Sequence, residues 1–354
     1  MKRPNSSTYV KFLAGIAGLA VMALLGMKLF APAKEEGLSL FQYLSENEVH
    51  AIDIQVDMHS VLEKDSVWFP AILSWQDASG SKTEVQVELE ARGKNRREVC
   101  EFPPLKMRVV PGDGHPFRKG SYKVVTHCLE GSGESLLLRE YLVYQLYGAL
   151  TENSFRTNLL AVTYTDKSGA VPPVRSRIIL LEGKKEILAR LDATDLEAEE
   201  PVREISATDY HLFAVFQFMI GNTDWNLDKE HNVRLIARGE NALPIPVPYD
   251  FDRSGLVNAP YAEPHPMLPI DNVRERFFQW RGKDRKQLEP VLALFRERHD
   301  RLMNLIWEME ELPLAERQDI VRYLEEFFEN MDLLLTEGRY NSGWGQFVVQ
   351  GEIG

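Results

Sequence analysis

Three oxygen-bearing side chains in the second half of the chain have types and an order that suit magnesium-dependent phosphoryl transfer. Asp224 follows an apolar run that ends at Gly221, Asn232 comes eight positions after it, and Asp250 follows two strand-like runs. Carboxylate and amide oxygens are the hard ligands that Mg²⁺ prefers in proteins. Phosphoryl transfer also needs a carboxylate near the attacking hydroxyl group. The pattern therefore predicts a site that holds Mg²⁺ and transfers a phosphoryl group.

The elements around these residues indicate how they come together. Residues 210–220 are apolar nearly all round, which is typical of a helix buried on every side. This helix fixes the start of the loop that carries Asp224. Two strand-like runs, 232–237 and 244–248, flank a turn and predict a short hairpin. We expect the hairpin to return the chain, with Asp250, to the edge of this loop.

The first half of the chain is rich in strand-like segments, and the rest is mainly helical. Alternating or apolar runs bounded by turn residues predict strands. The predicted strands cover residues 51–61, 66–75, 84–92, 122–126, 158–166 and 175–183. One helix, residues 136–150, interrupts them, and two long helices are expected over 284–310 and 314–335. We therefore divide the chain into a β-rich part, residues 37–183, and a helical part, residues 184–354.

The length and composition argue against several classes of protein. At about 150 residues per domain, 354 residues suggest two domains or lobes, and 44% hydrophobic residues can bury a sizeable core. The 53 acidic and 41 basic residues give a net charge of −12, which disfavours a broad surface for binding nucleic acid. Two cysteines without a CxxC or HExxH motif argue against a zinc site.

The N-terminal segment has the pattern of a membrane helix or a secretion signal. Lys2, Arg3 and Lys11 precede an uncharged apolar stretch, residues 12–26. This stretch is long for a cleaved signal and shorter than the roughly 20 residues of a spanning helix. We expect residues 1–36 to contain a signal-anchor helix, with a cleaved signal peptide and a buried soluble helix as the alternatives. Either of the first two places the rest of the chain outside the cytoplasm.

The two cysteines, Cys100 and Cys128, have two possible states. Outside the cytoplasm, thiols pair more readily than inside it. The sequence leaves open whether these two form a disulfide or remain buried thiols.

Short motifs that match a known family occur in order along roughly residues 88–258. The motifs are Ala91-Arg92-Gly93, Pro103-Pro104-Leu105-Lys106, Leu138-Arg139-Glu140, Asp224, His231-Asn232 and Pro248-Tyr249-Asp250-Phe251-Asp252. Together they resemble the spore-coat kinase CotH-like family, a group of atypical secretory-type protein kinases. The resemblance implies an α+β, two-lobed, atypical protein-kinase-like fold. A β-rich N-terminal lobe and a mainly helical C-terminal lobe would follow one N-terminal hydrophobic helix.

The resemblance also implies roles for the residues of the phosphoryl-transfer site. Asp224 is similar to the catalytic-loop base of the family. Asn232 and Asp250 are similar to its two Mg²⁺ ligands, and Asp252 is an alternative or additional ligand. The implied substrate is Mg-ATP, and the implied acceptor is a hydroxyl group of a protein or a small molecule.

Further residues are implied to bind the nucleotide. Lys106 matches the strand lysine of the family, whereas Lys123 lies 17 residues before Glu140, about the distance expected between a phosphate-binding lysine and its helix glutamate. We prefer Lys123 of the two. Glu182 resembles a hinge residue where adenine would dock. Arg92 lies in a turn that is a candidate cover for the phosphates.

The chain departs from common protein-kinase motifs at three points, which keeps other functions open. No GxGxxG loop precedes either lysine, IGNTD replaces the HRD triplet, and Asp252 replaces the glycine of DFG. The second hypothesis is therefore a catalytically inactive, kinase-fold envelope protein with a binding or assembly role. The third is a metal-dependent hydrolase that uses Asp224, Asp228, His231 and Asp250.

Overall fold

The computed structural model describes most of the chain. It covers residues 37–63, 67–77, 79–93, 96–112, 115–196, 204–336, 338–342 and 345–349, and it omits the side chains of residues 96–97 and 338–349. Leu38–Gly354 form one compact unit, and the description that follows applies to it. The predicted hydrophobic helix within residues 1–36 lies outside the described residues.

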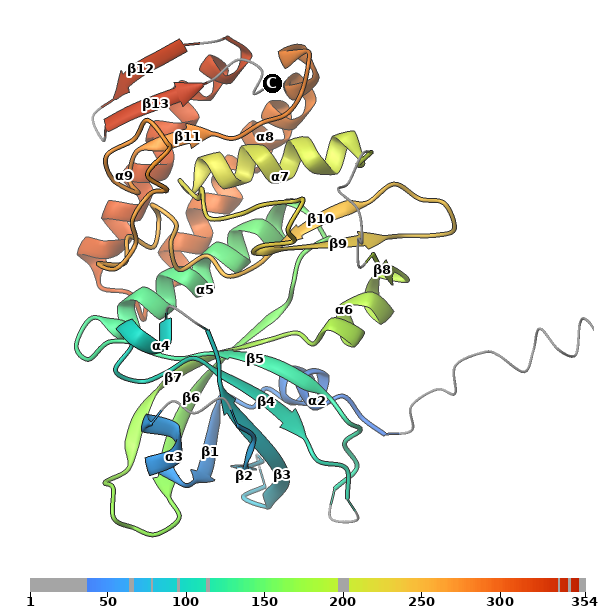
Figure 1. The fold of residues 1–354 in the computed structure, drawn as a ribbon, viewed down its shortest axis with the longest axis vertical. Helices are drawn as coiled ribbons and strands as arrows, with labels where there is room; N and C mark the ends of the chain where they lie inside the picture. Colours follow the sequence, from blue (N-terminus) through green and yellow to red (C-terminus); the bar gives the residue numbers. More distant parts are fainter. Residues whose placement is uncertain are drawn as a thin grey trace, which may run out of the picture. The chain divides into compact units, whose positions relative to one another are not determined.

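A closed seven-stranded β-barrel forms the first part of this unit (Figure 1). Its strands are β1 (Ala51–Val56), β2 (Phe69–Gln76), β3 (Lys82–Ala91), β4 (Leu105–Val109), β5 (Ser121–Val125), β6 (Thr157–Asp166) and β7 (Val174–Leu181). They pair in the order β1-β2-β3-β4-β5-β7-β6. The barrel closes where β1 pairs with β6 in parallel, and the other neighbouring strands pair in antiparallel fashion.

Alternation of apolar and polar residues explains why these segments form barrel strands. In β1 every second residue is buried, so that Ile52, Ile54 and Val56 join the apolar core of the barrel. The large side chains of Trp75 and Tyr164 are almost fully buried in the same core. Side chains therefore fill the interior, as is usual for a barrel of so few strands.

Three short helices accompany the barrel strands. They are α2 (Leu40–Glu46), α3 (Met58–Leu62) and α4 (Arg96–Val99). The strand predicted over residues 51–61 ends earlier, at Val56, because Asp57 begins α3. The Asp57 carboxylate accepts hydrogen bonds from the backbone N–H groups of His59 and Ser60, which is a helix N-cap that the strand prediction overlooked.

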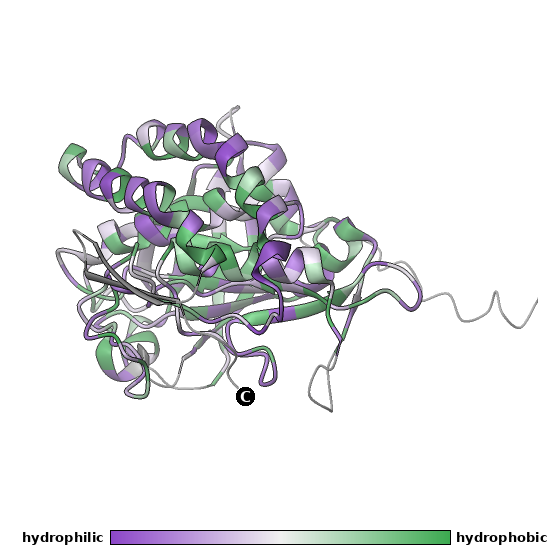
Figure 2. Ribbon diagram, turned by 90° about the horizontal axis from the view of Figure 1, so that it is seen from above, coloured by the Kyte–Doolittle hydropathy of each residue, from purple (hydrophilic) through white to green (hydrophobic). Residues whose placement is uncertain are grey.

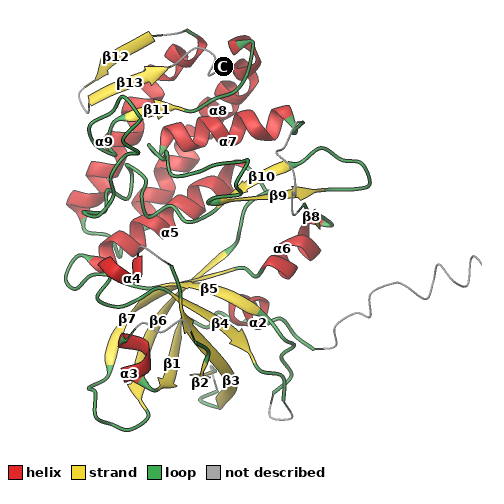
Figure 3. Cartoon of the chain, viewed as in Figure 1, coloured by secondary structure: helices red, strands yellow, loops and turns green. Residues whose placement is uncertain are grey.

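Longer helices build a second apolar core beyond the barrel (Figure 3). They are α5 (Gly133–Leu150), α7 (Ala207–Met219), α8 (Glu289–Glu308) and α9 (Leu314–Asn330), and the shorter α6 (Lys184–Leu191) follows β7. Residues 210–219 of α7 are all buried, which confirms the prediction of a helix enclosed on every side. Figure 2 shows hydrophilic and hydrophobic bands along other helices, as expected where only one face of a helix is buried.

Two small sheets and two 3₁₀ helices complete the unit. The first sheet contains β8 (Thr194–Asp195), β9 (Val233–Ala237) and β10 (Ile245–Pro248), and the second contains β11 (Arg276–Phe278), β12 (Gly338–Ser342) and β13 (Gly345–Val349). The 3₁₀ helices are η1 (Arg285–Leu288) and η2 (Met331–Leu335). The antiparallel pairing of β9 with β10 confirms the predicted hairpin.

The predicted two-lobed, protein-kinase-like fold was wrong. The strands close into a seven-stranded barrel, and Leu38–Gly354 form one compact unit rather than two. Closure depends on pairing between residues far apart in the chain, such as Ala51 with Ala161. Local periodicity predicts strands but not their partners, so it did not reveal the barrel. The division of the chain between residues 183 and 184 stays a prediction.

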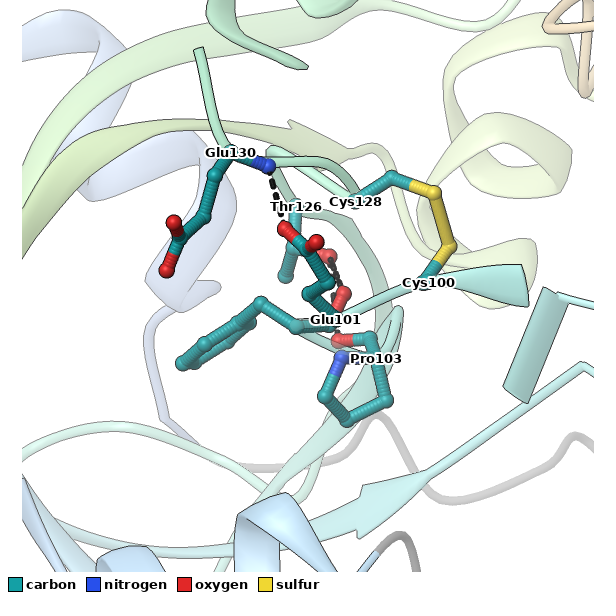
Figure 4. Close-up of a disulfide and its surroundings, with 7 residues drawn as sticks. Cys100, Glu101, Pro103, Thr126, Cys128 and Glu130 are labelled. Atoms are coloured by element: carbon teal, nitrogen blue, oxygen red, sulfur yellow. Dashed lines mark hydrogen bonds between the residues drawn. A yellow bond between two sulfur atoms is a disulfide. The ribbon is translucent and has the colours of Figure 1, made fainter. Parts of the chain in front are cut away.

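The two cysteines form a disulfide, which settles the choice that the sequence left open (Figure 4). Cys100 follows α4 and Cys128 follows β5, and both are buried. Backbone N–H groups of Glu101 and Phe102 donate to the carbonyl oxygen of Cys128 at 2.8 and 3.1 Å. The Glu130 N–H donates to the Glu101 carboxylate at 2.6 Å. The connection between β3 and β4 is thereby fastened to the end of β5.

Candidate functional site

The loop that carries Asp224 begins where α7 ends. Gly221 has a φ of +64°, and a Cβ atom on it would lie 2.2 Å from the hydroxyl oxygen of Tyr323, so only glycine fits this position. The buried Asn222 follows. Its side-chain N–H donates to Oε1 of Gln217 at 2.9 Å, and its Oδ1 accepts the Asp224 N–H at 3.0 Å. The buried helix therefore fixes the direction in which the loop leaves it.

The carboxylate of Asp224 is held by three neighbouring side chains. Nε2 of His231 lies 2.9 Å from its Oδ1, and Nδ2 of Asn232 donates to its Oδ2 at 3.1 Å. Nε of Arg253 lies 3.9 Å from Oδ2. The Asp224 side chain is still 34% exposed, so a molecule from solvent can reach it.

Asn232 connects this loop to the β9–β10 hairpin. It adopts a left-handed backbone with φ of 55° and is largely buried. Its Nδ2 also donates to the backbone oxygen of Asp224 at 2.8 Å, which leaves its Oδ1 as an acceptor. The Asn232 carbonyl oxygen accepts the N–H of Tyr249 at 3.0 Å. Asp250 therefore lies one residue after Tyr249, whose backbone is hydrogen-bonded to Asn232 at the end of the Asp224 loop.

Asp250 lies where the hairpin, the barrel and α5 meet. Its φ is +65°, and its N–H donates to the hydroxyl oxygen of Tyr144 in α5 at 2.9 Å. Nη2 of Arg92, directly after β3, donates to its Oδ2 at 3.1 Å. Both side chains of this ion pair are largely buried, at 18% and 20% exposure. The pair fixes the carboxylate relative to the barrel.

Lys123 of β5 belongs to the same cluster. Its Nζ lies 3.3 Å from the centroid of the Tyr249 ring. Burial lowers the pKa of Lys123 to about 7, and the charge of Arg92 adds to this effect, while Asp250 and Glu140 act in the opposite direction. Near neutral pH, Lys123 therefore exchanges between ammonium and amine.

The two remaining acidic candidates lie in the interior. Glu140 of α5 is 1% exposed, and its charge acts on Lys123, as expected from the spacing of the two residues. Asp252 is 4% exposed and follows Phe251, which is part of the helical core. The sequence predicted both carboxylates as site residues, and in the structure both are buried.

Lys106 and Glu182 have different surroundings from the Asp250 cluster. Lys106 is exposed and pairs with Lys123 across the β4–β5 ladder, and its Nζ lies 5.5 Å from the centroid of the Trp68 ring. The two carboxylate oxygens of Glu182 each lie 2.8 Å from the guanidinium of Arg190. The acidic side chain of the predicted hinge residue is therefore engaged in a buried ion pair.

Sequence reasoning missed Tyr144, Tyr249 and Arg253 as members of the site. Tyr144 lies four residues after Glu140 on the same helix, and residues at this spacing share a helix face. Tyr249 lies within the motif that contains Asp250, and Arg253 directly follows that motif. Both signals were present in the sequence and would have supported these assignments.

Two comparisons with known proteins found no match to this chain. No family model matches the chain, and no curated protein matches it significantly. The resemblance to the CotH-like family therefore stays a prediction.

In the described part of the chain, no three or more His, Cys, Asp or Glu side chains form a group that could hold a metal ion. Asp228, which the hydrolase hypothesis uses, pairs with Arg281 at 2.8 Å.

The described helices were also compared with the requirements of a membrane span. None of them combines the length and the apolar character that crossing a bilayer requires. The membrane helix predicted from residues 12–26 falls on residues that are not described.

Proposed function

We propose that this protein is a phosphotransferase that moves the terminal phosphoryl group of Mg-ATP to a hydroxyl group of a protein or a small molecule. One observation carries the proposal, namely that two polar clusters meet at the β9–β10 hairpin. The first cluster is Asp224 with Asn232. The second is Asp250 with Arg92 and Lys123. A backbone hydrogen bond from the residue before Asp250 to Asn232 joins the two.

Arg92 and Lys123 supply the positive charge for the phosphates. The pKa of Lys123 is lowered by burial and then by Arg92, so the two cationic groups act on each other. An anion bound between them relieves this repulsion and forms charge-assisted hydrogen bonds with both. Phosphate binding is therefore expected to raise the pKa of Lys123 and to draw a proton from solvent.

We propose that Asp250, Asp252 and Asn232 would hold Mg²⁺, a set that combines two carboxylates with one amide. Asp250 and Asp252 offer carboxylate oxygens, and Asn232 directs its N–H toward Asp224 and keeps its Oδ1 available. These are the hard oxygen ligands that Mg²⁺ takes up. When bound, Mg²⁺ neutralises the charge that develops on the phosphates during transfer.

We assign the role of proton acceptor to Asp224. As the acceptor hydroxyl oxygen forms its bond to the terminal phosphorus, the bond to the bridging oxygen of ADP breaks and the hydroxyl proton passes to the Asp224 carboxylate. His231 and Asn232 orient that carboxylate through its two oxygens. Its partial exposure admits an acceptor from solvent.

The proposal places the body of the protein outside the cytoplasm, secreted or tethered by the N-terminal segment. The Cys100–Cys128 disulfide supports this, because structural disulfides are typical of oxidising compartments.

Calorimetry with Mg-ATP tests the binding part of the proposal. We expect the Lys123→Met variant to bind at least about tenfold more weakly than the wild type, because a charge-assisted contact to phosphate is lost. Lys283→Met is the matched control, since Lys283 is an exposed lysine that takes no part in the Asp250 cluster. Absence of binding to the wild type, or equal losses in both variants, would contradict the proposal.

One observation favours a second candidate, an inactive binding or assembly protein. Arg92 donates to an oxygen of Asp250 that a magnesium ion would also require. A protein of this kind would bind its partner without turning over ATP. Retained Mg-ATP binding together with no loss of the terminal phosphate under any condition would favour this candidate.

A further inference from the structure

A second cationic site lies on the outside of the barrel, and the proposed phosphotransferase mechanism does not use it. The site is a cavity of about 360 Å³. Its basic lining residues are Lys106, Arg108, Arg118, Lys119, Lys184 and Lys185. The whole chain has a net charge of −12, so this concentration of positive charge runs against the composition of the protein. We refer to it as the basic cavity.

Three separate elements bring these basic residues together. Lys106 and Arg108 are alternate residues of β4, so both side chains stand on its outer face. Lys119 precedes β5, and Lys184 and Lys185 begin α6. Segments of the chain that lie more than 60 residues apart thus contribute to one wall (compare β4, β5 and α6 in Figure 1). The clustering is a product of the fold, not of one charged run in the sequence.

An aromatic ring organises one side of the basic cavity. The guanidinium carbon of Arg108 lies 4.2 Å from the centroid of the Trp68 ring, and Nζ of Lys106 lies 5.5 Å from it. Cation–π contacts at these distances hold the two cationic groups near the ring. The cavity wall is therefore partly ordered before any ligand arrives.

Acidic groups also lie near this wall, outside the lining. Glu88 pairs with Arg108, Asp195 pairs with Lys184, and Glu90 lies opposite Lys106 on β3. Glu186 is the one acidic residue in the lining, and its Oε1 accepts a hydrogen bond from the hydroxyl group of Tyr122 at 2.7 Å. The lining therefore keeps an excess of positive charge.

The start of α6 adds the positive end of a helix dipole to the same wall. Gly183 is the N-cap of this helix, and Lys184 and Lys185 are its first two residues. The helix dipole is positive at this end, and the Glu186 carboxylate, which accepts the Gly183 N–H at 3.0 Å, offsets part of it. Together with the basic side chains, this end of the helix suits a ligand with several negative charges.

We propose that the basic cavity binds phosphate groups of a multivalent anion, either a soluble condensed phosphate or the headgroup of an anionic phospholipid. Arg and Lys side chains bind phosphate oxygens through charge-assisted hydrogen bonds. The lipid source is included because Leu38 adjoins the cavity: the Arg118 N–H donates to the Leu38 oxygen at 3.0 Å. Leu38 comes two residues after residues 1–36, the segment for which we predict a membrane helix. The cavity thus adds a second anion site to the proposed function and does not depend on it.

The test uses the full chain and two probes at about physiological ionic strength. Tripolyphosphate binding is measured by calorimetry, and binding to vesicles with or without phosphatidylglycerol is measured by flotation. The test variant is Lys119→Glu/Lys185→Glu, which reverses two charges of the cavity. Both residues are exposed, and a glutamate near the start of α6 suits the helix dipole, so the fold should be kept. The matched control is Lys283→Glu/Lys286→Glu, which makes the same change of charge at two exposed residues elsewhere.

We expect at least one probe to bind the wild type and the control, and to bind the test variant at least about tenfold more weakly, which corresponds to about 1.4 kcal/mol. The probe that responds identifies the source of the phosphate. Failure of both probes to bind the wild type would overturn the proposal, as would equal losses in test variant and control. Loss of tripolyphosphate binding in Lys123→Met but not in the test variant would also overturn it, because the anion would then occupy the Asp250 cluster.

Discussion

Replacing Lys123 by methionine should change how the stability of the protein depends on pH. Burial, and then the charge of Arg92, lower the pKa of Lys123 in the folded protein from 10.5 to about 7. Between these two values the unfolded chain binds more protons than the folded one, so the stability of the wild type rises as the pH rises. Methionine has a similar length and no charge, so the variant lacks this contribution.

The expected size follows from the two pKa values. One pKa unit corresponds to about 1.36 kcal/mol. With a folded-state pKa of about 7, Lys123 raises the unfolding free energy of the wild type by at most about 3 kcal/mol between about pH 7 and about pH 9.5. Partial access of solvent to the side chain reduces this figure, so it is an upper limit.

Urea denaturation at the two pH values measures this effect. Other groups also titrate in this range, so the quantity of interest is the difference between the wild type and Lys123→Met. We expect the unfolding free energy of the wild type to increase relative to that of Lys123→Met as the pH rises. The exposed Lys106→Met control should follow the wild type. Parallel pH profiles for the wild type and Lys123→Met would refute the argument that Lys123 is buried beside a second cation.

Three further substitutions test how the site is supported, each by urea denaturation. Cys100→Ser, compared without reductant, should cost about 3.5 kcal/mol, because the disulfide closes a sequence separation of 28 residues; an unchanged midpoint would contradict this. Gly221→Ala should cost more than Gly239→Ala, since both have positive φ but only the first places a Cβ atom 2.2 Å from the Tyr323 hydroxyl; equal losses would show that the contact does not matter. Glu182→Gln should cost about 3 kcal/mol, because it leaves a largely buried arginine without its charge partner; a change below about 1 kcal/mol would argue against that ion pair.

Much of the local structure was predictable from periodicity. The all-apolar run that became α7 and the paired runs that became β9 and β10 needed no knowledge of distant contacts. The short helix α6 was missed because half of its eight residues are charged and only Ile187 and Leu191 are buried. The barrel was missed because strand partners are set by tertiary contacts.

The candidate site was predictable only in part. Asp224 and Asn232 lie eight positions apart, and a loop of this length allows their contact. The ion pair between Arg92 and Asp250 joins residues 158 positions apart, and it depends on where the barrel meets the hairpin. The lowered pKa of Lys123 has the same origin, since it arises from burial and from charges brought together by folding.

The proposed function requires that Asp224 takes part in phosphoryl transfer from ATP. Phosphorus NMR of Mg-ATP incubated with the protein follows the terminal phosphate directly. We expect the wild type to remove the terminal phosphate, and Asp224→Asn to do so at least about 100-fold more slowly while its Mg-ATP affinity changes little. Equal rates for the two proteins, or an ATP spectrum that stays unchanged with the wild type, would contradict it.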